Sequence, residues 1–343
     1  MNLTHLKQLV TFKRVGGLYV LLAIIVVFGI LKPDTFLTTQ SIKTVLNQYS
    51  VSGMIALSLV IPLSCGVFDL SVGAQASLSS VMVAVLITQH HVSIPLAIIL
   101  TIAIGQVAGL VNALIIVGWR IDSFIGTLGT GAIFSAVAVA ITGNKTITGP
   151  VISGAFQRNI ALRSINGITI PVLYFVVIVL VVGYVLERTK TGRHWYAIGF
   201  DIDAARLAGV RTRALRVAAL QVDSLIATIA GITLTARVSS GTAGVGDAYL
   251  LAAFAGAFLG ATQFRNGRFN PWGTALAIIL IGTGEYGLSL SNAPVWAPNV
   301  FDGVVLIAAI GITNIEGGKL RVPPWLRGVA AARKPATAAP TES

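Results

Sequence analysis

The sequence predicts an all-α fold: a polytopic membrane protein of about ten transmembrane helices, with short broken or re-entrant helices among them. Of its 343 residues, 55% are hydrophobic and only 10% are charged, whereas a soluble domain is about one-quarter charged. Its mean hydropathy is +0.85. The 36 glycines are compatible with a membrane bundle, because small residues let neighbouring helices approach closely.

Ten apolar runs account for the number of spans, because a transmembrane helix needs about 20 mostly apolar residues. The runs cover 15–31, 51–67, 71–88, 94–117, 124–142, 169–186, 215–236, 248–263, 272–290 and 300–315. Several are short and two connections are tight, so we expect some spans to be tilted, broken or shielded by neighbours. The first run is expected to be an uncleaved span, because Phe28–Pro33 offers no small-x-small cleavage site.

The distribution of basic residues predicts the orientation, since lysine and arginine favour the cytoplasmic side of a membrane. With the N-terminus inside, the inner segments contain 18 basic residues and the outer segments contain 6. We therefore expect a cytoplasmic N-terminal segment at 1–14, a transmembrane domain at 15–315 and a cytoplasmic tail at 316–343. The Ala/Pro/Thr-rich tail cannot bury enough apolar surface to fold, so we expect it to be disordered.

Recognisable catalytic and metal sites are missing from the sequence. There is no G-x-x-x-x-G-K-[ST] phosphate loop, so any ATP would be bound and hydrolysed by a separate subunit. The four histidines and the single cysteine, Cys65, have no metal-ligand spacing, and no serine lies in a G-x-S-x-G elbow. The net charge of +12 is spread through loops between spans, which argues against nucleic-acid binding. The sequence therefore favours transport, without a cofactor, over enzymatic activity.

The most polar stretch, Glu187–Arg213, lies between two apolar runs and contains six of the 24 basic residues. Such a loop must lie in water, and its positive charge places that water on the cytoplasmic side. Within it, Asp203–Gly209 is a helix-prone segment of charged and apolar residues, of the kind that docks against a soluble partner. The alternative is a solvated loop with no partner.

Acidic residues in the apolar regions indicate where a pathway could lie, because intramembrane charges are costly and usually face a polar cavity or the bundle interior. Glu285 lies near the middle of the ninth run, where a role in the pathway or its gating competes with a structural hydrogen bond. Asp223 lies nearer the inner end of the seventh run, where a structural role is favoured. Asp69 comes just before the third run, so N-capping is favoured there over a direct role in transport.

Four motifs follow one another in a recognisable order. Gly66–Gly73 reads GVFDLSVG, and Ser123–Thr130 reads SFIGTLGT. Thr191–Val210 contains G-R, A-I-G and A-A-R-L-A-G-V in succession, and two glycine-rich stretches follow at Asp247–Gly260 and Arg265–Gly273. Each motif alone is weak. Together, and with this topology, they resemble the GGIDLSVG, F-I-x-T-L-G-x and A-A-R-L-x-G-I segments of the ribose-type permease subunits of bacterial ABC sugar importers.

The resemblance covers about residues 47–315 and implies a permease subunit in the bacterial inner membrane. Two copies, in a homodimer or a related heterodimer, would line a pathway for a monosaccharide or another small polar solute. A periplasmic or lipid-anchored sugar-binding protein would deliver the solute, and ABC ATPase subunits would dock beneath the membrane.

The resemblance also implies roles for two loops. The loop 187–214 would couple transport to the ATPase through Gly192, Arg193, Asp203, Ala204, Ala205, Arg206 and Gly209. The external connection 143–168 is basic and contains no acid. Its Lys145, Arg158 and Arg163 would help to dock an acidic rim on the binding protein.

Departures from the family pattern leave the solute open. Val67 and Phe68 replace the second glycine and the usual aliphatic residue of the first motif, and Asp223 and Glu285 stand where the family usually has uncharged residues. The last two suit a polyol, an amino-bearing sugar or another small polar solute. The rival class is a secondary transporter driven by an ion gradient, which also uses broken helices and midplane sites. The charged cytoplasmic loop favours the ABC importer.

Overall fold

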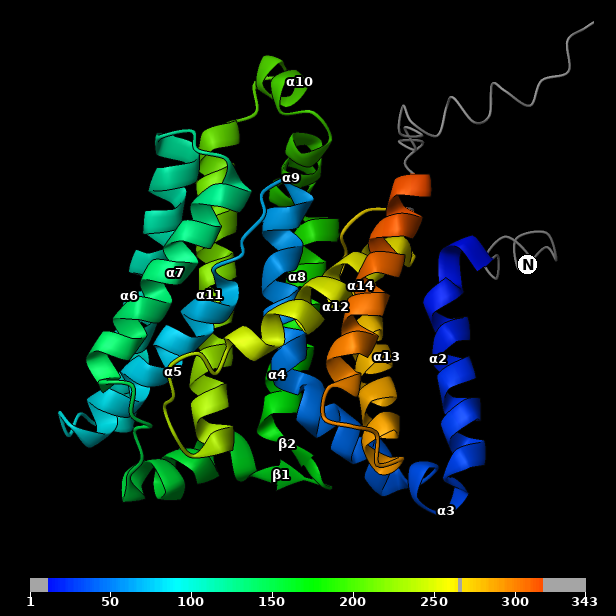
Figure 1. Cartoon of the computed structure of the whole chain (residues 1–343). Coiled ribbons are helices and arrows are strands. Elements are labelled where there is room, and N and C mark those ends of the chain that lie inside the picture. Colours follow the sequence, from blue (N-terminus) through cyan, green and yellow to red (C-terminus); the bar gives the residue numbers. More distant parts are fainter. Residues whose placement is uncertain (1–11, 265–266, 317–343) are drawn as a thin grey trace, which may run out of the picture.

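The computed structural model describes residues 12–264 and 267–316, which form a helical bundle (Figure 1). Within these residues, six helical segments are long and apolar enough to cross a membrane. They are α4 (Thr39–Ser64), α6 (Ile94–Ala113) continued by the π-helix η1 (Leu114–Gly118), α7 (Ser123–Thr142), α8 (Ile170–Arg188), α11 (Thr212–Val238) and α13 (Pro271–Leu290).

Four shorter apolar segments complete the bundle. They are α2 (Phe12–Leu31), α5 (Val72–Thr88), α12 (Leu250–Thr262) preceded by the 3-10 turn η4 (Asp247–Tyr249), and α14 (Ala297–Glu316). The long and short segments correspond one for one to the ten predicted runs. The prediction of an all-α polytopic membrane protein is therefore confirmed.

The remaining elements lie at the two ends of the bundle (Figure 1). At one end are α9 (Lys190–Phe200) and α10 (Ile202–Leu207). At the other end are α3 (Pro33–Phe36), the π-helical turns η2 (Ile152–Phe156) and η3 (Arg158–Leu162), and a hairpin of β1 (Ser164–Ile165) and β2 (Ile168–Thr169). We refer to these as the α10 end and the hairpin end.

The predicted start of the second span was wrong by 12 residues, because α4 begins at Thr39 instead of 51. Its first turns are polar, so hydropathy alone did not include them. Thr38 provides the start signal: its hydroxyl accepts a hydrogen bond from the Ser41 amide at 3.1 Å, as an N-cap residue does. The extension matters because this polar part of α4 lines a cavity described below.

The core is centred on α4 and α11, the most buried of the long spans, whereas α6 and α7 have mostly exposed outer faces. Close helix approach at this centre depends on glycine. A Cβ atom at Gly231 of α11 would collide with the Ala76 carbonyl oxygen of α5. Such small-residue contacts are how membrane helices pack without a hydrophobic driving force between them.

The helices α5 and η4–α12 begin inside the bundle, as the prediction of broken or re-entrant helices requires (Figure 1). The chain reaches α5 from the α10 end, after α4, and it reaches η4 from the hairpin end, after α11. The two starts contact each other: the Gly246 amide donates to the Ser77 hydroxyl at 2.8 Å. Two half-helices that meet inside a bundle resemble the discontinuous helices that form transporter sites.

The start of α2 and the end of α14 lie at the α10 end (Figure 1). This agrees with an even number of crossings between them. Most of the N-terminal segment 1–14 and of the tail 316–343 lies outside the described residues, so the predictions made for those segments remain predictions.

Candidate functional site

A polar cavity of about 530 Å³ opens in the hairpin half of the bundle, between α4, the end of α11, η4–α12, α13 and α14. Its wall is rich in hydroxyl, amide and charged groups, contributed by Thr44, Asn47, Gln48, Tyr49, Ser52, Arg237, Tyr249, Glu285, Asn299 and Asp302. Glu285 thus lies on the wall of a cavity that faces away from α10. We call this the outer cavity, because the distribution of basic residues predicts that the hairpin end faces outside.

Two carboxyl groups lie together in the outer cavity. The Tyr49 hydroxyl donates to Glu285 Oε2 at 3.2 Å, and the Asp302 carboxyl faces that of Glu285. Arg237 lies on the same wall, but its guanidinium donates to the Gln48 carbonyl oxygen at 2.8 Å and forms no ion pair with a residue in the described ranges. Of the two acids, Glu285 is therefore the one available to a solute, because Asp302 is only 7% exposed and its Oδ1 is buried.

A second pair of acids is sealed inside the bundle. Asp69 Oδ1 accepts hydrogen bonds from the Ser71 amide at 2.7 Å and the Ser71 hydroxyl at 2.6 Å. Asp69 Oδ2 accepts from the Asn112 side chain of α6 at 3.1 Å, and Asn112 accepts from Thr130 of α7 at 2.6 Å. The preference for N-capping was wrong, because Ser71 is the N-cap residue and no side chain caps α5. Asp69 instead closes the turn before α5 and joins it to two other helices.

Asp223 faces this network from α11. It is fully buried, and both of its carboxyl oxygens lack a hydrogen-bond donor among the described residues. The nearby Ser58 hydroxyl donates to its own helix, at the Ile55 carbonyl oxygen, and the Asp69 carboxyl also faces Asp223. The preference for a structural role over a pathway role agrees with this complete burial.

An apolar groove of about 430 Å³ runs along the other side of η4. Phe68 and Phe254 both stack on Phe258, with ring centroids 6.3 and 6.4 Å apart, and Phe124 lines the same groove. Asp247 is an exposed acid on this apolar wall. Because Ala248 and Tyr249 line the outer cavity, the turn η4 separates the cavity from the groove.

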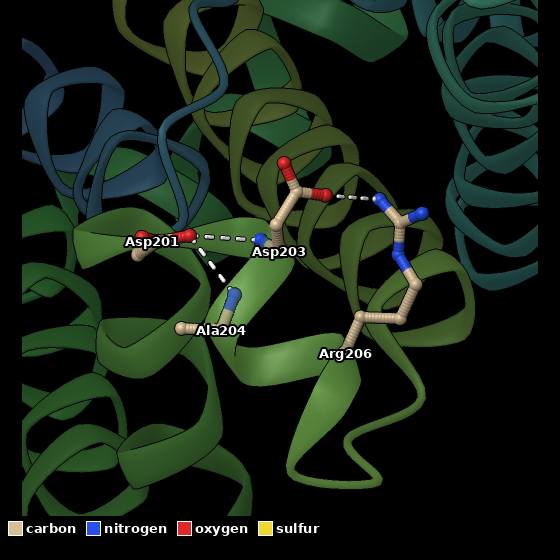
Figure 2. Close-up of polar contacts among 4 residues, drawn as sticks. All are labelled: Asp201, Asp203, Ala204 and Arg206. Carbon is tan, nitrogen blue, oxygen red and sulfur yellow. Dashed lines mark hydrogen bonds and ion pairs between the residues drawn. The ribbon is translucent and has the colours of Figure 1, made fainter.

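The predicted helix-prone segment at Asp203–Gly209 forms α10 at the α10 end of the bundle. The Asp201 side chain caps it by accepting hydrogen bonds from the amides of Asp203 and Ala204, both at 2.9 Å (Figure 2). Arg206 pairs with Asp203 at 2.7 Å (Figure 2). After α10, Gly209 has a φ of +81°, a left-handed conformation that glycine adopts without strain.

The surface around α10 exposes apolar side chains that a partner protein could cover. Leu207 and Phe200 are 90% and 92% exposed, which places two large apolar side chains beside the charged pair. Of the other predicted coupling residues, Arg193 and Ala204 are exposed, whereas Gly192 and Ala205 are buried. Gly192 is a packing residue, because a Cβ atom there would collide with the Val185 and Leu186 backbone of α8.

The predicted external loop lies at the hairpin end. Its three basic residues, Lys145, Arg158 and Arg163, are exposed, while Ile152 and Phe156 anchor the loop by burial. The hairpin reaches the outer cavity, since the Asn47 side chain accepts from the Thr169 amide and donates to the Gly167 carbonyl oxygen, both at 3.0 Å. Among the residues that the structure describes, no group of three histidines, cysteines or acids could hold a metal ion.

Comparison with known proteins shows the family of the chain. Residues 41–310 match the family described as the branched-chain amino acid transport system / permease component. The chain belongs to this permease family. It is also 32% identical over 298 residues to the ribose import permease protein RbsC of Bacillus subtilis, covering 87% of this chain and 92% of that one.

Two further relatives of this permease come from Escherichia coli. The D-allose transport system permease protein AlsC is 28% identical over 302 residues, covering 88% of the permease and 92% of AlsC. The autoinducer 2 import system permease protein LsrD is 27% identical over 305 residues, with the same coverage. The chain is therefore a multi-pass permease subunit of an ABC importer. It works with an ATPase and a binding protein, and the secondary-transporter alternative is not supported.

Sequence reasoning missed several residues of these sites. Tyr49, Arg237 and Asp302 line the same cavity as Glu285 and come from three other helices, and Asn112 joins Asp69 from 43 positions away. Only Asp302 carried a signal, as an acid inside the tenth run. Asp247 marks the start of a helix that hydropathy placed at 248.

Proposed function

We propose that this permease imports a monosaccharide or a related polyhydroxyl solute, and that the outer cavity receives it. The observation that carries the proposal is the lining of the cavity by carboxyl, amide, hydroxyl and guanidinium groups. Sugar hydroxyls both donate and accept hydrogen bonds, so they match such a mixed lining. The volume of about 530 Å³ is in the range of small-molecule sites, and two of the relatives are named for ribose and allose.

A branched-chain amino acid is the second candidate, because the family description names that solute. Arg237, together with Glu285 and Asp302 in the same cavity, would suit the two charges of an amino acid. An aliphatic side chain, however, would find little apolar surface in the outer cavity, where Ala248, Ala252 and Pro298 are the small apolar residues on the wall. The lining therefore favours the polyhydroxyl solute.

The pathway would continue from the outer cavity past η4 to the apolar groove. Asp247 supports this route, because an exposed acid on an apolar face inside the membrane needs water or a partner. The aromatic cluster of Phe68, Phe254 and Phe258 would act as the closed gate. We propose that a second permease copy covers this groove, so that the solute passes between the two copies.

The α10 end would face the cytoplasm and the hairpin end the outside, as the distribution of basic residues predicts. Both termini would then be cytoplasmic, in the bacterial inner membrane. The segment around α10 would dock the ATPase through the Asp203–Arg206 pair and the exposed Leu207 and Phe200. On the outer face, Lys145, Arg158 and Arg163 would dock an acidic rim of the binding protein.

Uptake assays test the solute. The permease, its ATPase and its binding protein are reconstituted in proteoliposomes, and ATP-dependent uptake of ribose, allose and leucine is measured in parallel. We expect uptake of a sugar and none of leucine. Uptake of leucine alone would overturn the proposal in favour of the amino acid.

Two variants test the coupling segment. Asp203→Lys removes the ion pair at α10, and Gly209→Trp places a bulky side chain at an exposed left-handed position with open space around it. Both should uncouple ATP hydrolysis from uptake while the protein still inserts. Normal uptake and normal co-purification with the ATPase in both variants would contradict the assignment.

Disulfide crosslinking tests the second copy. The native Cys65 is buried, so a cysteine introduced at exposed Leu251 in the groove would be the accessible thiol. We expect oxidation to link two copies through Leu251→Cys, and not through Leu180→Cys on the exposed face of α8. Equal crosslinking at both positions would show that the groove is not a specific contact.

A further inference from the structure

A basic cavity of about 770 Å³ opens at the α10 end, between the α6–α7 connection and the start of α11. The charged residues on its wall are five arginines and one aspartate: Arg120, Arg206, Arg211, Arg213, Arg216 and Asp122. The aspartate is already engaged, because it accepts hydrogen bonds from the backbone amides of Phe124 and Ile125 at the start of α7. The cavity therefore carries a large excess of positive charge.

Most of this charge has no counter-charge within residues 12–264 and 267–316. Of the five arginines, only Arg206 forms an ion pair there, with Asp203. Arg216 Nε is buried and has no hydrogen-bond partner among the same residues, and a buried donor without a partner is costly. The start of α11 adds to the positive electrostatic potential in the cavity. No side chain caps this helix, and its free backbone amides favour an anion.

The surface beside the cavity is apolar and faces outward. Ile121, on the cavity wall, is 40% exposed, and the neighbouring Trp119 and Phe124 are 65% and 51% exposed. These residues connect α6 and α7, whose outer faces are the most exposed of the long spans. Tryptophan is enriched where a protein meets the membrane–water interface. An acyl chain along this surface would place its headgroup at the cavity.

We propose that this cavity binds the phosphate headgroup of an anionic phospholipid. Arg120 holds the headgroup from the α6–α7 connection, and Arg211, Arg213 and Arg216 hold it from α11. Guanidinium groups pair with phosphate oxygens through two parallel hydrogen bonds, and basic pockets between membrane helices bind anionic headgroups. A soluble phosphate offers the same kind of oxygen atoms to the arginines but does not cover the apolar surface. The site goes beyond the proposed import function and does not depend on the solute.

Lipid titration of the purified full-length permease tests the site. The thermal unfolding midpoint in detergent is followed as short-chain phosphatidylglycerol, short-chain phosphatidylcholine or inorganic phosphate is added. We expect phosphatidylglycerol to raise the midpoint, because a ligand that binds the folded state stabilises it. The other two should have little effect.

Variants locate the effect. Arg120→Gln with Arg216→Gln should raise the phosphatidylglycerol concentration needed for half of the stabilisation on the order of tenfold. The matched control, Arg158→Gln with Arg163→Gln, removes the same charge at the hairpin end and should respond like the wild type. Because Arg216 is partly buried, Arg211→Gln with Arg213→Gln repeats the test at two exposed positions.

Three results would overturn the proposal. The first is an unchanged response to phosphatidylglycerol in both cavity variants. The second is equal stabilisation by inorganic phosphate, which would make a soluble anion the occupant. The third is loss of ATPase co-purification in the cavity variants with an unchanged lipid response, which would assign the arginines to an acidic surface of the ATPase.

Discussion

Two pairs of carboxyl groups lie within the bundle, and their surroundings differ. Asp69 and Asp223 are 2% and 0% exposed, while Glu285 lies on the wall of the outer cavity with Asp302, which is 7% exposed, beside it. In the sealed pair, Asp69 accepts hydrogen bonds from two other residues. In the open pair, Glu285 accepts one from Tyr49 and faces the Asp302 carboxyl, and its remaining lone pairs face the cavity.

This difference indicates a structural role for the sealed pair and a role in transport for the open pair. A carboxylate that is buried and already hydrogen-bonded has no capacity left for a solute, and removing it leaves its donors unpaired. A carboxylate on a cavity wall retains lone pairs for a ligand. The same residue type therefore holds helices together in one place and is expected to bind the solute in the other.

The largest effect is expected from Asp69→Ala. The Ser71 amide and hydroxyl would lose their acceptor in a buried site, at about 1–3 kcal/mol each, while the Asn112 side chain would keep the Ser71 hydroxyl as an acceptor. Thermal unfolding of the purified permease should therefore show a lowered midpoint and a poor yield of assembled complex. Asp302→Ala is the control from the open pair and should lower the midpoint much less. Equal losses would remove the distinction between the two pairs.

Glu285→Gln should produce the next largest effect, and on transport instead of stability. The amide oxygen can still accept the Tyr49 hydrogen bond, so the unfolding midpoint should change little. A charge-assisted contact with the solute would be lost, at roughly 1.4 kcal/mol or more, which is about a tenfold fall in uptake. The measurement is proteoliposome uptake normalised to assembled complex. Wild-type rates and selectivity would assign Glu285 to the structural class.

Asp223→Asn tests whether Asp223 has a structural role in the sealed pair. The two carboxyls face each other, and a hydrogen bond between them requires one to hold a proton. The asparagine amide can donate to Asp69 without a like charge. We expect an unfolding midpoint equal to that of the wild type or higher by an amount worth up to about 1 kcal/mol, with uptake retained. A fall in uptake at unchanged stability would move Asp223 into the transport machinery.

The sequence was sufficient for the spans and insufficient for the sites, for a physical reason. A membrane span needs about 20 apolar residues in a row, so each of the ten is a local property of the chain. The outer cavity combines Tyr49, Arg237, Glu285 and Asp302 from four helices, and only tertiary packing brings them together. Hydropathy also failed to predict the first turns of α4, because these turns are polar and face that cavity instead of lipid.

The smallest effect is expected from the basic loop at the hairpin end, where the binding protein would deliver the solute to the outer cavity. The hairpin that borders the outer cavity ends the loop that carries Arg158 and Arg163, and both arginines are exposed. Exposed ion pairs contribute about 0–1 kcal/mol each and are screened by salt. The double variant Arg158→Gln with Arg163→Gln should therefore slow association of the binding protein a few-fold at low ionic strength and hardly at all at high ionic strength. The same double change at Arg188 and Arg193, at the α10 end, should not alter this rate. An unchanged association rate at low salt in the Arg158 and Arg163 variant would remove the loop from the docking surface.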